Sequence, residues 1–127
     1  MTTTPHHPYL RIPIDADQGF PQALRISLGR RIYVLSAHVN VTDEELLRAT
    51  TPLRLPCPGA FLALEVSAEE AAGTRVLFRR KVVADLEYEA AELALLFTDL
   101  SVHPRNINGS GAYGSSVVGG VALRWVS

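Results

Sequence analysis

A glycine-rich run is the first feature of this 127-residue chain that could do chemistry. Gly109 to Gly114 reads Gly-Ser-Gly-Ala-Tyr-Gly and has the spacing of the dinucleotide fingerprint, in which a strand-to-helix turn holds a pyrophosphate. The following residues, Ser115 to Val121, are β-branched and glycine-rich and predict no helix. Nor can an acidic residue stand about 20 positions further on, as the fingerprint requires, because the printed chain ends too soon. We therefore predict an adaptable loop here and no cofactor.

Carboxylates at alternate positions are the second such feature. Asp85, Glu87 and Glu89 would share one face of a strand, and paired carboxylates carry out acid–base catalysis in glycoside hydrolysis. With Leu86 and Tyr88 on the opposite parity, the commoner outcome is an acidic face turned to solvent. A small hydrolase that uses these carboxylates is kept as one alternative function, ranked after the two that are given at the end of this subsection.

The cysteine and the histidines do not form a catalytic or metal-binding pattern. Cys57 lies between two prolines, with no base or helix start beside it to activate a thiolate. The four histidines, including the adjacent His6 and His7, lack the spacing of a metal-ligand set, and His103 before Pro104 is read as a turn residue. We predict no catalytic residue, no metal and no enzyme activity.

Charge and hydropathy exclude further classes of partner. Twelve Lys and Arg against thirteen Asp and Glu give a net charge of −1, so no overall basic field would attract nucleic acid. The longest apolar run, Leu93 to Phe97, is far shorter than the roughly 20 residues of a membrane helix. The N-terminus lacks the pattern of a signal peptide. We expect no nucleic acid and no membrane.

Short strands must position whatever site exists. We divide the chain into a flexible N-terminal arm, residues 1–8, and a single β-rich domain, residues 9–127. Apolar residues alternate with polar ones in Gln22 to Leu28, and Gly29-Arg30 leads tightly into Arg31 to Val39, which predicts a hairpin. The second of these strands is apolar on both parities, so we expect it to be covered on both faces.

The later segments complete an all-β pattern with one short helix. Thr42 and Glu45 have capping-box spacing and predict a helix that ends near Thr51. Ser67 to Gly73 predicts a helical turn or a long hairpin loop, and Leu100 to Ser116 predicts a long loop. Gly119-Gly120 predicts a bulge or a close backbone approach. With seven or eight strands in all, we predict a compact β-sandwich or barrel.

This arrangement of strands resembles a family of small β-rich proteins of tailed-phage baseplates. These are the plugs, also called ripcords, that close the central hub of cyanophage-type contractile tails. The stretches that carry the resemblance are Ile12 to Ile14, Gln22 to Leu35, Phe61 to Val66, Leu95 to Asp99, Pro104 to Gly114 and Val121 to Trp125. The chain departs from the family between Thr42 and Pro58, where a helix and a proline-rich connector replace a shorter link.

The resemblance implies a structural role in a contractile injection machine. It implies a non-enzymatic component that plugs or lines the baseplate hub, next to tail tube and spike proteins. It also implies a few symmetric copies, for example three, assembled in the host cytoplasm and located in the virion.

Partner contacts are predicted at exposed loops, aromatic residues and arginines, which favour interfaces in general. The candidates are Pro8, Tyr9, Arg79, Arg80, Asn106, Asn108 and Tyr113. The alternative function is a β-sandwich module that recognises carbohydrate through a loop. Its weakness is the small number of aromatic residues, because the single tryptophan, Trp125, falls in a predicted strand.

Overall fold

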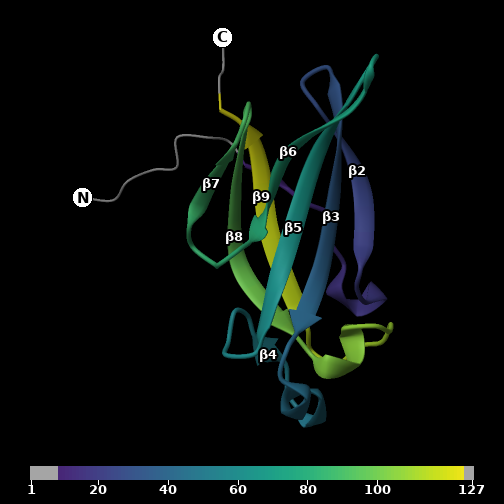
Figure 1. Ribbon diagram of the computed structural model, residues 1–127, viewed down its shortest axis with the longest axis vertical. Helices are drawn as coiled ribbons and strands as arrows, with labels where there is room; N and C mark the ends of the chain where they lie inside the picture. The colour runs from purple at the N-terminus through teal and green to yellow at the C-terminus, as the bar shows by residue number, and fades with distance from the viewer. Residues whose placement is uncertain (1–8, 125–127) are drawn as a thin grey trace, which may run out of the picture.

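This computed structural model describes residues 9–124 of the chain (Figure 1). Within this range lie nine strands and three short 3-10 helices, joined by turns and loops. The strands form two antiparallel sheets, which confirms the predicted all-β class and, of the two predicted forms, gives the sandwich. Within residues 9–124, no helix is long and apolar enough to span a membrane. The predicted arm, residues 1–8, and its contact candidate Pro8 lie outside the described residues, as do residues 125–127.

The four-stranded sheet has the order β2-β3-β5-β6. Its strands are β2 (Gln22–Leu28), β3 (Arg31–Val41), β5 (Ala60–Glu70) and β6 (Gly73–Lys81). Side chains alternate in and out along β5, where Leu62, Leu64 and Val66 are fully buried and the residues between them are half-exposed. The predicted hairpin is confirmed, because Leu28 pairs with Arg31 across Gly29-Arg30.

The five-stranded sheet has the order β1-β9-β8-β4, and β7 also pairs with β8. Its strands are β1 (Leu10–Arg11), β4 (Leu53–Arg54), β7 (Glu87–Ala90), β8 (Leu93–Val102) and β9 (Ser116–Leu123). The glycine pair lies opposite a register shift between Phe97 and Asp99 of β8, and the close approach that it allows is to side chains and not to another backbone. A Cβ atom at Gly119 would lie 2.5 Å from the Phe97 ring, and one at Gly120 would lie 2.8 Å from Cβ of Tyr9.

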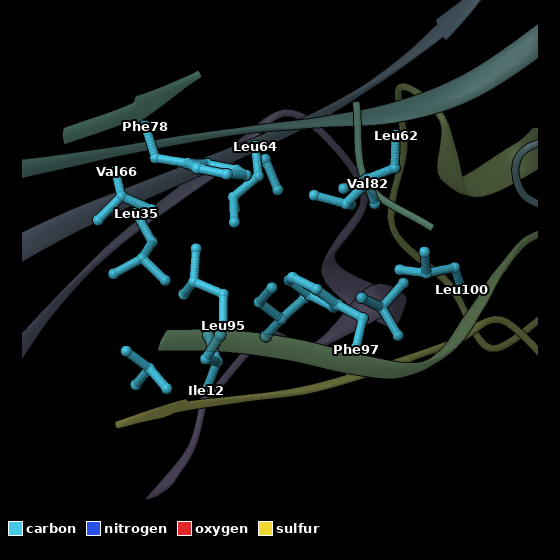
Figure 2. Close-up of a cluster of buried hydrophobic side chains, with 14 of the residues drawn as sticks. Ile12, Leu35, Leu62, Leu64, Val66, Phe78, Val82, Leu95, Phe97 and Leu100 are labelled. Carbon is cyan, nitrogen blue, oxygen red and sulfur yellow. The ribbon is translucent and has the colours of Figure 1, made fainter. Parts of the chain in front are cut away.

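The core lies between the two sheets. Figure 2 shows Leu35, Leu64 and Val66 of the four-stranded sheet facing Leu95 and Phe97 of the other sheet. Burial of such side chains contributes about 1.5–3 kcal/mol each and is the main force that holds the sheets together.

The outer face of β3 corrects one prediction. Ile32 is 39% exposed and His38 is also exposed, so β3 is covered on one face only. The expectation of two covered faces was wrong because no element of the described range packs as a second layer on this side of the sheet. The surface instead carries an ion pair across the sheet, in which Arg25 and Glu69 are 2.6 Å apart.

The expected helix is a 3-10 helix, η2, that spans only Glu44–Arg48. Its N-cap is Asp43, whose side chain accepts a hydrogen bond from the Glu45 amide at 3.1 Å. Thr42 was therefore the wrong cap. Its own amide bonds to the carbonyl of Gly59 at 2.7 Å and holds Thr42 beside the start of β5.

The segment after Val66 also differs from its prediction. Ser67 to Glu70 continue β5, and Glu70 pairs with Gly73, so only Ala71 and Ala72 form the turn. A helical turn or a long loop was wrong here because pairing with β6 and burial of Ala68 outweigh the low strand propensity of Ala and Glu.

Candidate functional site

One end of the sandwich carries the elements that the sequence marked as a long loop (Figure 1). β8 continues to Val102, and the connection to β9 begins with η3 (Pro104–Asn106). η2 packs beside η3 at the same end. We call η2, residues 49 and 50, and residues 103–115 together the loop end.

Asn106 shapes the loop end from inside. Its side chain is 0% exposed, and its Nδ2 donates to the carbonyls of Gly109 and Gly111 at 3.2 and 2.9 Å. Ser115 donates its hydroxyl hydrogen to Oδ1 of Asn106 at 2.6 Å and accepts the His103 amide at 2.7 Å. These bonds satisfy carbonyls that no sheet ladder reaches.

The predicted contact role of Asn106 is corrected by this burial. A side chain with no exposed surface, whose donors and acceptor are all engaged, does not touch a partner in this conformation. The same bonds fold the glycine-rich run into a defined shape, and the Gly111 amide ties it to η1 (Ala16–Gln18) through the Asp17 carbonyl at 2.8 Å. The run leads into strand β9, which agrees with the prediction that no helix follows it.

A cavity of about 470 Å³ opens between η2 and η3. Polar side chains from both elements line it, namely Arg48, Thr50, His103 and Arg105, together with the half-exposed Leu47. The cavity is therefore rich in hydrogen-bond donors and has one apolar wall.

His103 lines this cavity, and a hydrogen bond fixes the state of one of its ring nitrogens. The residue is 8% exposed, and its Nδ1 accepts the backbone amide of Arg105 at 3.0 Å. In the neutral ring, an acceptor at Nδ1 leaves the proton on Nε2. Nε2 has no hydrogen-bond partner among residues 9–124, so it is available as a donor to a ligand.

Tyr113 holds the other cavity groups in place. Its ring lies 5.2 Å from the His103 ring, and the Arg105 guanidinium lies 5.6 Å from its centroid. A cation over an aromatic face is attracted by the ring quadrupole, which orients Arg105 without neutralising its charge. Within residues 9–124, Arg48 has only a loose ion pair with Glu45 at 3.8 Å, and both side chains are exposed, so its charge is also largely available.

The structure separates the predicted contact residues. Asn106, Asn108 and Tyr113 belong to the loop end, and the last two are exposed. Arg79 lies on the outer face of the four-stranded sheet, 2.6 Å from Glu65. Arg80 lies over the Tyr88 ring, 5.4 Å from its centroid.

Tyr9 lies on the outer face of the other sheet. Its hydroxyl donates a hydrogen bond to Glu87, and its side chain covers Gly120. Burial, followed by the hydrogen bond and the negative charge of Glu87, raises the pKa of Tyr9. Glu87 and Glu89 are exposed on β7, where Glu89 pairs with Arg124, and Asp85 occupies a turn at φ +64°.

Sequence reasoning missed the chemically richest members of the loop end, which are Arg48, His103 and Arg105. The order His-Pro-Arg, in which a capping side chain precedes a proline suited to the first turn of a helix, was a signal for His103 and Arg105 but not for Arg48. Among residues 9–124, no group of three or more His, Cys, Asp or Glu side chains is placed to hold a metal ion.

A second polar cluster lies at the opposite end of the sandwich, which we call the hairpin end. It comprises the turns at residues 29–30, 71–72 and 91–92 and the side chains around them. Tyr33 donates its hydroxyl hydrogen to Glu92 at 2.9 Å, and Arg31 and Arg75 approach Glu92 at 3.3 and 3.6 Å. Glu70 bridges the same two arginines, 3.6 Å from Arg31 and 2.9 Å from Arg75.

This network moves two pKa values in opposite directions. Burial, and then the hydrogen bond and charge of Glu92, raise the pKa of Tyr33 to about 12. Burial alone would raise the pKa of Glu92. Its own backbone amide, the Tyr33 hydroxyl and the two guanidinium groups together outweigh burial and lower that pKa below its usual value.

The fold and the loop end define a two-sheet β-sandwich with a donor-rich cavity at one end. Comparisons of this chain with protein-family models, with curated proteins and with solved structures found no match. The resemblance to baseplate plugs accordingly stays a prediction from the sequence.

Proposed function

We propose that this chain is a binding protein that acts through contacts, and that the loop end is its partner-binding surface. The observation that carries the proposal is the cavity between η2 and η3, with its two available guanidinium groups and the oriented Nε2–H of His103. Tyr113 contacts both His103 and Arg105, so these two donors are held in place before a partner binds, and η2 packs beside η3 and brings Arg48 to the same cavity.

The donors favour an acidic group on the partner. Guanidinium groups recognise carboxylates through charge-assisted hydrogen bonds, and the imidazole N–H and the Thr50 hydroxyl can complete the shell. Leu47 is 50% exposed and Tyr113 is 37% exposed beside these groups. Aromatic residues and arginine are enriched at the centres of protein interfaces, which supports a protein partner.

We further propose that the partner belongs to a phage tail or a related contractile injection machine. This step rests on the sequence resemblance to hub plugs, and the partners would then be baseplate hub, tail tube or spike proteins. The chain would be present in the virion in a few symmetric copies.

Purified tail particles test this assignment. Tails are isolated from the source strain after prophage induction, and the chain is quantified against the tube protein by mass spectrometry. We expect the chain to co-purify with tails at a few copies per particle. A chain that remains in the supernatant while complete tails sediment would contradict the tail assignment.

Photo-crosslinking tests the surface separately. A photoreactive phenylalanine analogue at the exposed Asn108 should crosslink to one tail protein in assembled particles. The same analogue at the exposed Ala71, in a turn of the hairpin end, is the matched control and should give little crosslinking. Crosslinking from Ala71 alone would place the contact surface at the wrong end of the sandwich.

A carbohydrate-recognition module is the second candidate, favoured by the Tyr113 ring beside a cavity lined with polar groups. That ring already contacts His103 and Arg105, which leaves less of it for stacking on a sugar. A glycan array tests the idea: specific binding that disappears in Tyr113→Ala would replace the protein-partner proposal.

A further inference from the structure

The hairpin end contains a second cavity, of about 500 Å³, that is separate from the loop end. It opens between the two sheets, because β3 and β6 of one sheet and β9 of the other all contribute to its wall. A cavity of this size falls in the range of small-molecule sites.

One side of this cavity is apolar. Leu28 of one sheet and Leu123 of the other both line it, and a Cβ atom at Gly29 would lie 3.3 Å from a Leu123 methyl group. The buried Tyr33 ring belongs to the same wall, and its hydroxyl is already bonded to Glu92. This wall therefore offers apolar surface without an unsatisfied polar group.

The rim carries one positive charge that no described residue balances. Arg31 and Arg75 share the carboxylates of Glu70 and Glu92, which makes that set of four neutral. Arg30 also lines the cavity and forms no ion pair with any residue in the described range 9–124. Its guanidinium group is thus available to an anion from outside.

We propose that the hairpin-end cavity binds a small amphipathic carboxylate. The carboxylate pairs with Arg30 at the rim, and the apolar body lies between Leu28 and Leu123. The charge balance favours a ligand with one negative charge, because Arg30 is the one lining arginine that no carboxylate of residues 9–124 neutralises. This inference does not depend on the proposed function, since the two cavities lie at opposite ends of the molecule.

Methyl NMR of the full chain with 4-phenylbutyrate as the probe tests the proposal. We expect saturable shifts of the Leu28 and Leu123 methyl resonances at millimolar ligand. The neutral isostere 4-phenylbutanamide should bind about tenfold more weakly, because it gives Arg30 no charge partner. No saturable shift of these methyl groups, or equal binding of the amide and the carboxylate, would overturn the proposal.

Two substitutions separate the rim charge from general effects. Arg30→Ala should weaken 4-phenylbutyrate binding about tenfold, and Arg30→Lys should restore most of it. Arg54→Ala is the matched control, because Arg54 is exposed on β4 and has no ion pair within residues 9–124. Binding that is unchanged in Arg30→Ala, or weakened equally in Arg54→Ala, would contradict the assigned role of Arg30.

Discussion

The hydroxyl of Tyr33 donates a 2.9 Å hydrogen bond to Oε2 of Glu92, and this bond joins the two sheets at the hairpin end. Tyr33 belongs to β3, and Glu92 immediately precedes β8 in the opposite sheet. Arg31 and Arg75 reach the same carboxylate, so all three hairpins of this end meet at one acidic group.

Tyr33→Phe should destabilise the fold without creating a cavity. The substitution removes one bond to a charged group, which contributes about 1.5–3 kcal/mol, and leaves the ring in the core. Chemical denaturation should report this loss in the free energy of unfolding, with an unchanged denaturant dependence. A variant as stable as the wild type would show that water replaces the hydroxyl without cost.

The Glu92 network predicts a specific loss of stability in acid. The pKa of Glu92 in the folded chain lies below its ordinary value of 4.5, so its charged form stabilises the fold above pH 4.5. This contribution disappears as the pH falls through the lowered pKa. The stability difference between wild type and Glu92→Gln should therefore be largest near neutrality and shrink below pH 4.5. A difference that is independent of pH would contradict the assignment of charge to Glu92.

Asn106→Ala should loosen the loop end. It removes the donor for two carbonyls and the acceptor for Ser115, and each unsatisfied group costs about 1–3 kcal/mol if it stays buried. Chymotrypsin should then cleave after Tyr113 much faster than in the wild type. Asn108→Ala is the control, since Asn108 is exposed and should change stability by no more than about 0.5 kcal/mol. Equal cleavage in both variants would show that Asn106 does not hold the loop.

Gly119→Ala should strain the contact between β9 and β8. The new Cβ atom would lie 2.5 Å from the Phe97 ring, which is itself fully buried and cannot move freely. Overpacking of this kind costs about 1–3 kcal/mol. Thermal unfolding should show a lower midpoint, and Gly119→Ala combined with Phe97→Leu should recover part of the loss if the ring is the cause.

Local pattern predicted the strands well where the side-chain period was clear. Alternation in Gln22 to Leu28 and Arg31 to Val39 placed a hairpin, because successive side chains point to opposite faces of a sheet. Alternation alone could not show that the outer face of β3 is uncovered, because that depends on whether a second layer packs there. Local pattern also did not predict the extension of β5 through Glu70, because this extension depends on pairing with β6 across the turn.

The segment that carries the candidate site was predicted as a loop, but the side chains that line its cavity were not predicted. Glycine, asparagine and length marked the segment after β8, yet the burial of Asn106 follows from carbonyls brought together only by the folded loop. The Tyr33–Glu92 contact joins residues from different sheets, and no local pattern reveals such a pair. Both depend on tertiary structure.

Incorporation of two arginine variants into tail particles tests the central claim most directly. Arg105→Ala removes a guanidinium group from the loop-end cavity, whereas Arg79→Ala removes an exposed one that pairs with Glu65 on the sheet face. We predict that copies of the chain per particle fall about tenfold for Arg105→Ala and remain at the wild-type level for Arg79→Ala. Equal incorporation of the two variants would contradict a partner-binding role for the loop end.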